Sequence, residues 1–211
     1  MQIAIFGASG ATGLLLTERA LAAGHHVVAL LRKPAEFPYL DRVAFVHGSA
    51  FDPIPVLNAV AGSDAVFSAL GARSLGKEEV LERAVPRIVD AMHKAGVRRM
   101  VALGSAGALP GSLDKQPMWR RWVVRNVAYR ILKYPVASQV SQYATLAKSD
   151  LDWTMVMPPM LTNGRARGRY RVDGDALPEG GSRISRADVA DFMMQQLASK
   201  EWSRKGVYLS W

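Results

Sequence analysis

Near its start the chain reads Gln2-Ile-Ala-Ile-Phe-Gly-Ala-Ser-Gly-Ala-Thr-Gly13, a short apolar run followed by glycines at positions 7, 10 and 13. The apolar run predicts a strand, and residues 11–23 predict a helix. In such a unit Gly7 permits a tight turn, Gly10 lets a pyrophosphate approach the backbone, and Gly13 lets the helix pack closely on the strand. The unpaired N–H groups at the helix start favour an anion. The stretch therefore predicts a phosphate-binding turn; the alternative is a plain tight turn.

Strands and helices alternate along the rest of the chain. Predicted strands cover residues 26–31, 43–47, 65–70, 99–103, 153–157 and 207–209. Predicted helices cover residues 54–60, 78–95, 136–149 and 187–198. Short apolar strands separated by helices indicate a parallel sheet covered on both faces. We expect an α/β protein with a Rossmann-type doubly wound parallel sheet. It would form one domain over residues 1–211, with a small C-terminal part facing a substrate.

Composition excludes several classes of protein and site. The 211 residues include no cysteine, which excludes disulfides, thiol nucleophiles and Cys-ligated metals. No apolar run reaches the ~18 residues that a membrane span needs, and no signal pattern precedes the first strand, so we expect a cytoplasmic protein. The four histidines lack metal-ligand spacing, so no metal site is expected.

The net charge of +9 lies in two segments. Residues 118–134 hold five basic residues and no acid, residues 165–171 hold four arginines and no acid, and the rest of the chain is balanced. This distribution favours local attraction of an anion and argues against a nucleic-acid partner. In an extended strand, Arg165, Arg167, Arg169 and Arg171 would share one face and could attract an anionic substrate; the alternative is a solvated edge strand.

The basic, aromatic stretch between Trp119 and Tyr134 predicts an amphipathic helix. We interpret it as a lid whose apolar face covers the substrate cleft. Contact with a membrane surface or a protein partner is the alternative that we favour less.

The second predicted strand ends in Arg32-Lys33. An acidic residue at this place would bind the ribose 2′-hydroxyl of NADH, whereas cations suit the 2′-phosphate of NADPH. The sequence therefore favours NADPH over NADH; the alternative is that both side chains only solvate a strand end.

Several segments together resemble the atypical short-chain dehydrogenases. They are the turn Gly7-Ala-Ser-Gly-Ala-Thr-Gly13, Arg32, Gly104-Ser-Ala106, Ser149-Asp-Leu-Asp-Trp-Thr-Met-Val-Met-Pro-Pro159 and Arg183-Ile-Ser-Arg-Ala-Asp-Val-Ala-Asp191. Within that family the chain is most similar to the biliverdin-IXβ reductase/flavin reductase group, and NmrA-like NADPH-sensing proteins are a more distant match.

The resemblance implies a set of cofactor-binding residues. The pyrophosphate would lie against Gly7, Ser9, Gly10, Ala11, Thr12 and Gly13, and the 2′-phosphate against Arg32 and Lys33. Residues 48–52, with Ala50 among them, would border the adenine, although Ser49 stands where the family usually has an acid. Leu70, Gly71 and Arg73 would pass under the middle of the cofactor. The nicotinamide would be lined by Ser105, Pro158, Pro159 and Met160.

Two residues are candidates for catalysis. Ser105 could orient a substrate carbonyl or the nicotinamide carboxamide, or it could simply cap the backbone. Tyr143 could donate a proton, but the lysine of the family's Tyr–Lys pair, expected four residues later, is Ala147 here, with Lys148 one position further. Lys148 would point about 140° away around the helix, so Tyr143 could instead be an ordinary pocket wall.

Three functions remain open from the sequence. The first is an NADPH-dependent reductase that passes hydride to a conjugated small molecule such as a flavin, a linear tetrapyrrole or a quinone. The second is a non-catalytic NADP(H) sensor that binds a protein partner, and the third is a sugar epimerase or dehydratase.

Overall fold

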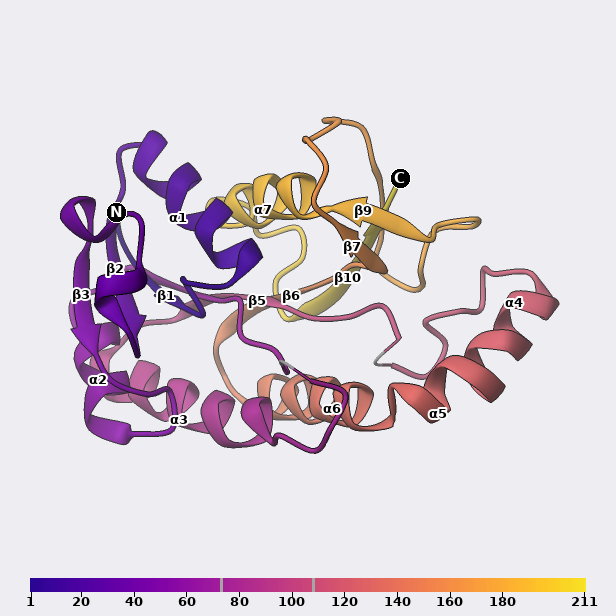
Figure 1. Ribbon diagram of the computed structural model, residues 1–211, viewed down its shortest axis with the longest axis horizontal. Helices are drawn as coiled ribbons and strands as arrows, with labels where there is room; N and C mark the ends of the chain where they lie inside the picture. The colour runs from indigo at the N-terminus through magenta and orange to yellow at the C-terminus, as the bar shows by residue number, and fades with distance from the viewer. Residues whose placement is uncertain (73, 108) are drawn as a thin grey trace.

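The computed structural model, which describes residues 1–72, 74–107 and 109–211, is built around a sheet of eight strands (Figure 1). The order across the sheet is β3-β2-β1-β4-β5-β6-β10-β8, and every neighbouring pair is parallel except β10 with β8. In this spatial order the strands are Ala44–His47, His26–Leu31, Gln2–Phe6, Ala65–Ser68, Arg99–Leu103, Asp152–Met157, Lys205–Ser210 and Arg171–Asp173. The predicted doubly wound parallel sheet is confirmed.

The chain reverses its direction across the sheet between β1 and β4. From β1 it moves outward through β2 to β3, and it then returns to the other side of β1 to form β4, β5 and β6. The loops at the carboxyl ends of β1 and β4 therefore diverge, and such a switch point is where sheets of this class leave a crevice for ligands.

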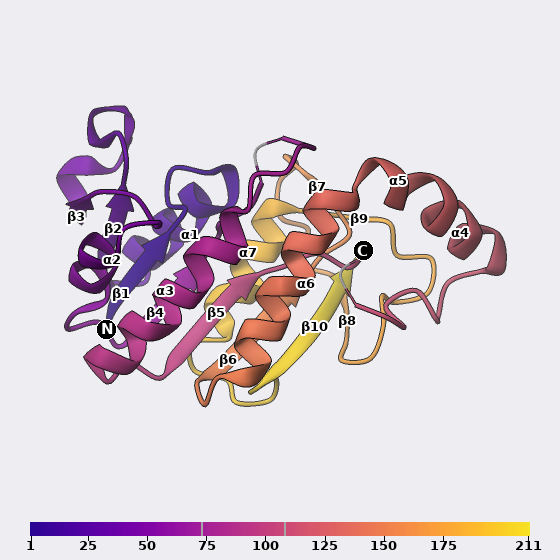
Figure 2. The ribbon, with the colours of Figure 1, turned by 90° about the horizontal axis from the view of Figure 1, so that it is seen from below.

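Helices cover both faces of the sheet (Figures 1 and 2). Helices α1 (Ala11–Ala22) and α7 (Arg186–Gln195) pack together on one face. Helices α2 (Pro53–Val60), α3 (Val80–Ala95) and α6 (Lys133–Lys148) form the layer on the other face. Alternate side chains of β1 enter the two cores: Ile3 and Ile5 face the α1–α7 layer, while Ala4 and Phe6 face the other.

The C-terminal half differs from the prediction in two parts: a pair of short strands was not predicted, and the helix predicted for the basic stretch is divided into shorter pieces. Strands β7 (Met160–Thr162) and β9 (Arg183–Ser185) form a small parallel pair. The basic stretch folds as α4 (Met118–Val123), a π-helical turn at Val124–Ala128 and α5 (Tyr129–Ile131). This arm lies at one end of the molecule, away from α2 and β3 (Figures 1 and 2). Within the described residues, no helix has the length and apolar character to cross a membrane.

The expectation that four arginines share one face of a strand is wrong. Of the four, only Arg171 lies in a strand, β8 at the edge of the sheet. The preceding loop wraps around the buried carboxylate of Asp188, which accepts hydrogen bonds from the backbone N–H groups of Arg167 (2.9 Å) and Gly168 (2.8 Å). The Arg167 guanidinium lies 3.5 Å from the centre of the Trp211 ring. Because this segment is a loop, its arginine side chains do not share the single face that a strand would have given them.

Candidate functional site

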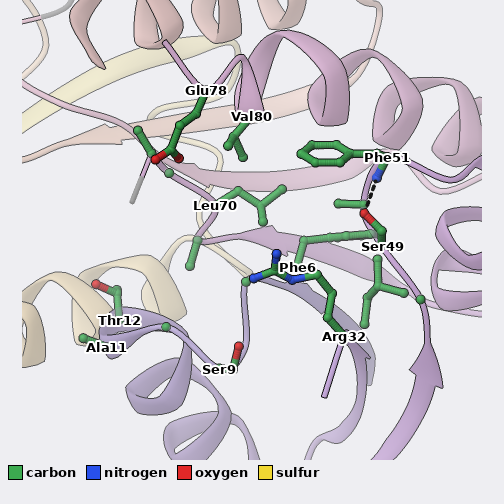
Figure 3. Close-up of a pocket in the computed structure, with 18 of the residues that line it drawn as sticks. Phe6, Ser9, Ala11, Thr12, Arg32, Ser49, Phe51, Leu70, Glu78 and Val80 are labelled. Carbon is green, nitrogen blue, oxygen red and sulfur yellow. Dashed lines mark hydrogen bonds between the residues drawn. The ribbon is translucent and has the colours of Figure 1, made fainter. Parts of the chain in front are cut away.

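A cavity of about 560 Å³ opens at the switch point of the sheet. Its wall comes from the residues that follow β1, β2, β3 and β4, together with the start of α3. Figure 3 shows Ser9, Ala11 and Thr12 on one side of this cavity and Phe51, Glu78 and Val80 on the other. We call it the cofactor cavity, since its position matches that of the predicted phosphate-binding turn.

The three glycines of the turn have separate structural roles. Gly7 has a φ of +78°, and a Cβ there would lie 2.7 Å from the carbonyl oxygen of Ala69. At Gly13 a Cβ would lie 2.0 Å from the carbonyl oxygen of Gly7, so only glycine allows α1 to pack this closely. Gly10 lines the cavity, and a Cβ there would meet Gly7 oxygen at 3.2 Å. Gly7 and Gly13 are thus required by the packing of the turn, while the approach of a pyrophosphate to Gly10 stays a prediction.

The N-terminus of α1 points its donors at this cavity. Gly10 is the residue before the first helical turn, and the first turn carries neither an acidic residue nor a side-chain cap. The N–H groups of Ala11, Thr12 and Gly13 have no intrahelical partner by position, and the first two residues line the cavity. Such a helix start attracts an anion through its donors and its dipole.

Arg32 and Lys33 differ in their surroundings. Arg32 lines the cofactor cavity from the end of β2 (Figure 3). Lys33 lies outside the described lining and donates to Glu36 at 2.9 Å, a hydrogen bond that raises the pKa of the Lys33 ammonium. Of the two predicted cations, the structure brings Arg32 to the cavity and leaves Lys33 in a surface ion pair.

The segment after β3 forms the far wall of the cofactor cavity. Ser49, Ala50 and Phe51 all line it, and the backbone N–H of Phe51 donates to the Ser49 hydroxyl at 3.1 Å (Figure 3). The guanidinium of the exposed Arg83 lies over the Phe51 ring, 4.3 Å from its centre. This wall offers an apolar surface and a small polar turn of the kind that an adenine could contact.

A second cavity of about 420 Å³ adjoins the first. Four residues after β4 and one residue of β7 line both cavities: Ala69, Leu70, Gly71, Ala72 and Leu161. Arg73, the next residue and a predicted cofactor contact, lies outside the described residues. We call this second space the acceptor cavity, and its shared wall places it directly beside the cofactor cavity.

The described lining of the acceptor cavity contains no ionisable side chain. Its polar members are three serines and one glutamine, namely Ser74, Ser105, Ser138 and Gln139. The remaining described lining residues are apolar or glycine. Such a space suits an uncharged, apolar or conjugated ligand, because an unpaired charge would lose its hydration there.

Ser105 reaches the acceptor cavity through the backbone geometry of the turn after β5. The N–H of Gly104 donates to Val156 oxygen at 2.7 Å, and the N–H of Ala106 donates to Pro158 oxygen at 2.9 Å. These bonds hold the turn against the end of β6 and leave Ser105 at the cavity.

Five other predicted residues lie outside the linings of both cavities, namely Gly13, Tyr143, Pro158, Pro159 and Met160. Tyr143 packs on the core side of α6, with its ring centre 5.5 Å from that of Trp153 in an edge-to-face arrangement. Pro158 is buried, and Met160 is 64% exposed. The structure therefore groups the turn, Arg32, Ala50, Leu70, Gly71 and Ser105, and it does not bring Tyr143, Pro158, Pro159 or Met160 to them.

Sequence reasoning missed several residues that line the cavities. Glu78 and Arg186 add charged groups to the cofactor cavity, and Leu161 contributes to both cavities. The segment 183–191 did signal the helix entry that carries Arg186, whose guanidinium donates to Asn163 at 2.6 Å. Leu161 had no local signal, because its position depends on the pairing of β7 with β9.

Of the stretch predicted to form a lid, only the end that joins α6 reaches the acceptor cavity. Leu132, Pro135 and Val136, at the junction of the arm with α6, line the acceptor cavity. The residues of α4 and α5 do not belong to the described linings, and most of their apolar side chains face solvent.

Comparisons with known proteins agree with this geometry. Residues 7–200 match the family described as NAD(P)H-binding. A protein from Burkholderia pseudomallei is 30% identical, with a TM-score of 0.81 and 100% of each chain covered. The oxidoreductase ylbE from Lactococcus lactis is 22% identical, with a TM-score of 0.82, and the match covers 100% of this chain and 90% of that one. The anaerobilin reductase ChuY from Escherichia coli O157:H7 is 24% identical, with a TM-score of 0.80 and coverage of 100% and 97%. With its glycine turn, switch-point cavity and nearly full-length family match, the chain belongs to the NAD(P)H-binding family.

Proposed function

We propose that the protein is an NADPH-dependent reductase for an acceptor whose reacting part is an uncharged conjugated system, such as a flavin, a linear tetrapyrrole or a quinone. The family match and the reductase neighbours support an NAD(P)H-dependent oxidoreductase. The observation that carries the choice of acceptor is the acceptor cavity, whose described lining is uncharged and which shares a wall with the cofactor cavity.

The residues of the cofactor cavity fit a dinucleotide. The glycine turn and the first N–H groups of α1 would hold the pyrophosphate. The guanidinium of Arg32 would hold a 2′-phosphate, which is the basis for proposing NADPH over NADH. Ser49, Ala50 and Phe51 would border the adenine, while Leu70 and Gly71 would support the middle of the cofactor.

The protein's own contribution is mainly to position two ligands. A bound NADPH supplies a hydride to the acceptor, and the proton that completes the reduction comes from water. Residues 69–72 and Leu161 line both cavities, so ligands bound in the two would lie side by side, and the leucines of the acceptor cavity would give the acceptor an apolar surface. The Ser105 hydroxyl would donate a hydrogen bond to an acceptor carbonyl and so orient it.

The residues that α6 presents to the acceptor cavity argue against a sugar epimerase or dehydratase. The part of α6 that lines the acceptor cavity presents Pro135, Val136, Ser138 and Gln139. Tyr143 lies about two turns further along and packs on Trp153. A tyrosine base of the kind those enzymes would use is therefore not among the described lining residues.

The uncharged lining also bears on the charge of the acceptor. The expectation of an anionic acceptor rested partly on the four arginines of residues 165–171, which do not form a common face. We therefore propose that any anionic group of the acceptor stays outside the acceptor cavity. A cytoplasmic location stays a prediction.

Turnover with blocked variants tests the proposal. Purified protein is mixed with NADPH and, in turn, menadione, flavin mononucleotide or biliverdin, and the absorbance of reduced nicotinamide is followed. In Val136→Trp the indole would fill the acceptor cavity, so turnover should fall at least about tenfold while NADPH affinity stays unchanged. Val140→Trp, one turn along on the same helix at a site that is 42% exposed and outside the described lining, is the matched control.

Two results would contradict this assignment. Equal turnover of Val136→Trp and Val140→Trp would show that the acceptor does not use this cavity. Tight NADPH binding without turnover of any of the three acceptors would favour the NADP(H) sensor instead.

A further inference from the structure

The α4–α5 arm exposes an unusually apolar surface for a peripheral helix. Trp119 is 68% exposed, Trp122 is 62% exposed and Ile131 is 58% exposed. Trp119, Val123, Val127 and Ile131 follow one another at steps of four residues, which places them along one side of a helix. We call this exposed set, together with Met118 and Trp122, the arm stripe. Exposed apolar side chains gathered in this way mark an interaction surface.

The inner side of the arm is fixed to the body of the protein. The Tyr129 hydroxyl donates to Gly107 oxygen at 2.8 Å. Arg120 donates to the side-chain oxygen of Gln116 at 2.9 Å and to Gly181 oxygen at 3.2 Å, and Arg121 forms an ion pair with Asp114 at 2.8 Å. Because these contacts hold the arm in place, the arm stripe faces outward as part of a preformed surface.

The charged side chains of the arm itself are all positive. From Lys115 to Ser149 the sequence contains no aspartate or glutamate. Arg125, Arg130 and Lys133 are exposed beside the arm stripe, and within the described part of the chain neither Arg125 nor Arg130 has an acidic partner. An apolar stripe with tryptophans, flanked by arginines, complements an anionic lipid surface, where the rings enter the headgroup layer and the cations meet lipid phosphates.

We infer that the α4–α5 arm binds the surface of an anionic lipid bilayer, with the arm stripe entering the headgroup region. The same charge argues against a second copy of this chain as the occupant. A symmetric pair of arms would bring two sets of unpaired arginines together, and like charges at an interface oppose association. The arm lies at the end of the long axis of the molecule, so the body would not prevent its approach to a flat surface (Figures 1 and 2).

Co-sedimentation with vesicles tests this inference, without cofactor or acceptor present. The full chain should bind vesicles of phosphatidylcholine that contain phosphatidylglycerol, and bind pure phosphatidylcholine vesicles much less. Arg125→Gln with Arg130→Gln should weaken binding to the anionic vesicles about 25-fold, since each cation near an anionic surface contributes roughly fivefold. Trp119→Ser with Trp122→Ser should weaken it at least about tenfold, through the lost apolar burial.

Matched controls carry the same changes elsewhere on the surface. Arg42→Gln with Lys200→Gln removes two exposed cations from other elements, and Phe45→Ser with Ile54→Ser removes two exposed apolar groups near the opposite end of the molecule. Both control pairs should retain at least about half of the binding affinity, apart from the small long-range effect of net charge. NADPH affinity, measured in parallel, should be the same for all variants, which separates this inference from the proposed function.

Three outcomes would overturn the inference. They are no binding of the full chain to anionic vesicles, equal losses in the arm and control variants, or concentration-dependent dimers that Trp119→Ser with Trp122→Ser abolishes while vesicles remain unbound. The last result would identify a second copy as the occupant of the arm stripe.

Discussion

Replacing Arg32 with Ala should change which nicotinamide cofactor the protein prefers. Arg32 lines the cofactor cavity, whereas its neighbour Lys33 is held in an ion pair with Glu36 and its side chain is 74% exposed. A single guanidinium is therefore available at the end of β2 for a 2′-phosphate. A hydrogen bond to a charged group contributes about 1.5–3 kcal/mol, which corresponds to roughly a 10- to 150-fold change in affinity. Partial exposure of the site places the expectation in the lower part of that range.

Isothermal titration with NADPH and NADH measures this effect. Arg32→Ala should weaken NADPH binding about tenfold or more and change NADH binding by less than about threefold. Lys33→Ala removes the same charge one residue away and should leave both affinities within about threefold, because its effect is limited to screened attraction. The reasoning would be refuted by equal affinities of the unmodified protein for the two cofactors, or by equal effects of Arg32→Ala and Lys33→Ala on NADPH.

Three further substitutions have expected outcomes. Gly10→Val should leave the circular dichroism spectrum unchanged and weaken NADPH binding at least about tenfold, because the added Cβ requires only a small shift of the Gly7 carbonyl oxygen, 3.2 Å away, while the branched side chain would occupy the cofactor cavity that Gly10 lines; unchanged affinity would mean that the turn does not hold the phosphates. Tyr143→Phe should lower turnover by less than about tenfold, since its ring packs on Trp153, and a loss of about a thousandfold with unchanged NADPH affinity would assign it the role of an essential acid. Burial opposes the ionisation of Asp188, but hydrogen bonds from Ser185, Arg167, Gly168 and Trp211 hold its pKa below the usual value. Its contribution to stability is therefore complete above the unfolded-state pKa of about 3.9 and is lost as pH falls through the lower folded-state value. Asp188→Asn should thus lower the free energy of unfolding at neutral pH by on the order of 2 kcal/mol, and denaturation curves of the two proteins should converge in acid; a constant difference down to strongly acidic pH would contradict this account.

Local patterns in the sequence predicted the features that depend on neighbouring residues. The glycine turn, the strands of the main sheet other than β8, and the Gly96 end of α3, where φ is 71°, all follow from a few consecutive residues. The predicted strand bounds differ from the observed ones by at most two residues at each end.

The features that could not be predicted depend on contacts between distant segments. The acceptor cavity is assembled from separate parts of the chain, and no local pattern connects them: residues 69–72, 74–75, Leu81, 103–105, Leu132, 135–136, 138–139 and Leu161. The alternation of arginines suggested a strand, but the buried carboxylate of Asp188 orders that segment as a loop. The apolar spacing of the arm predicted a helix correctly, yet periodicity alone does not tell whether another part of the protein covers its apolar side.

The shared wall between the two cavities also determines how independently the two ligand preferences can change. Arg32 lines one cavity, while Ser105 and Val136 line the other, so substitutions in these two groups should have additive effects on specificity. Leu70 and Leu161 belong to both linings, and a change at either would couple the two preferences. New acceptors could thus be acquired through residues of the acceptor cavity alone, with the choice of cofactor preserved, as long as the shared wall stays the same.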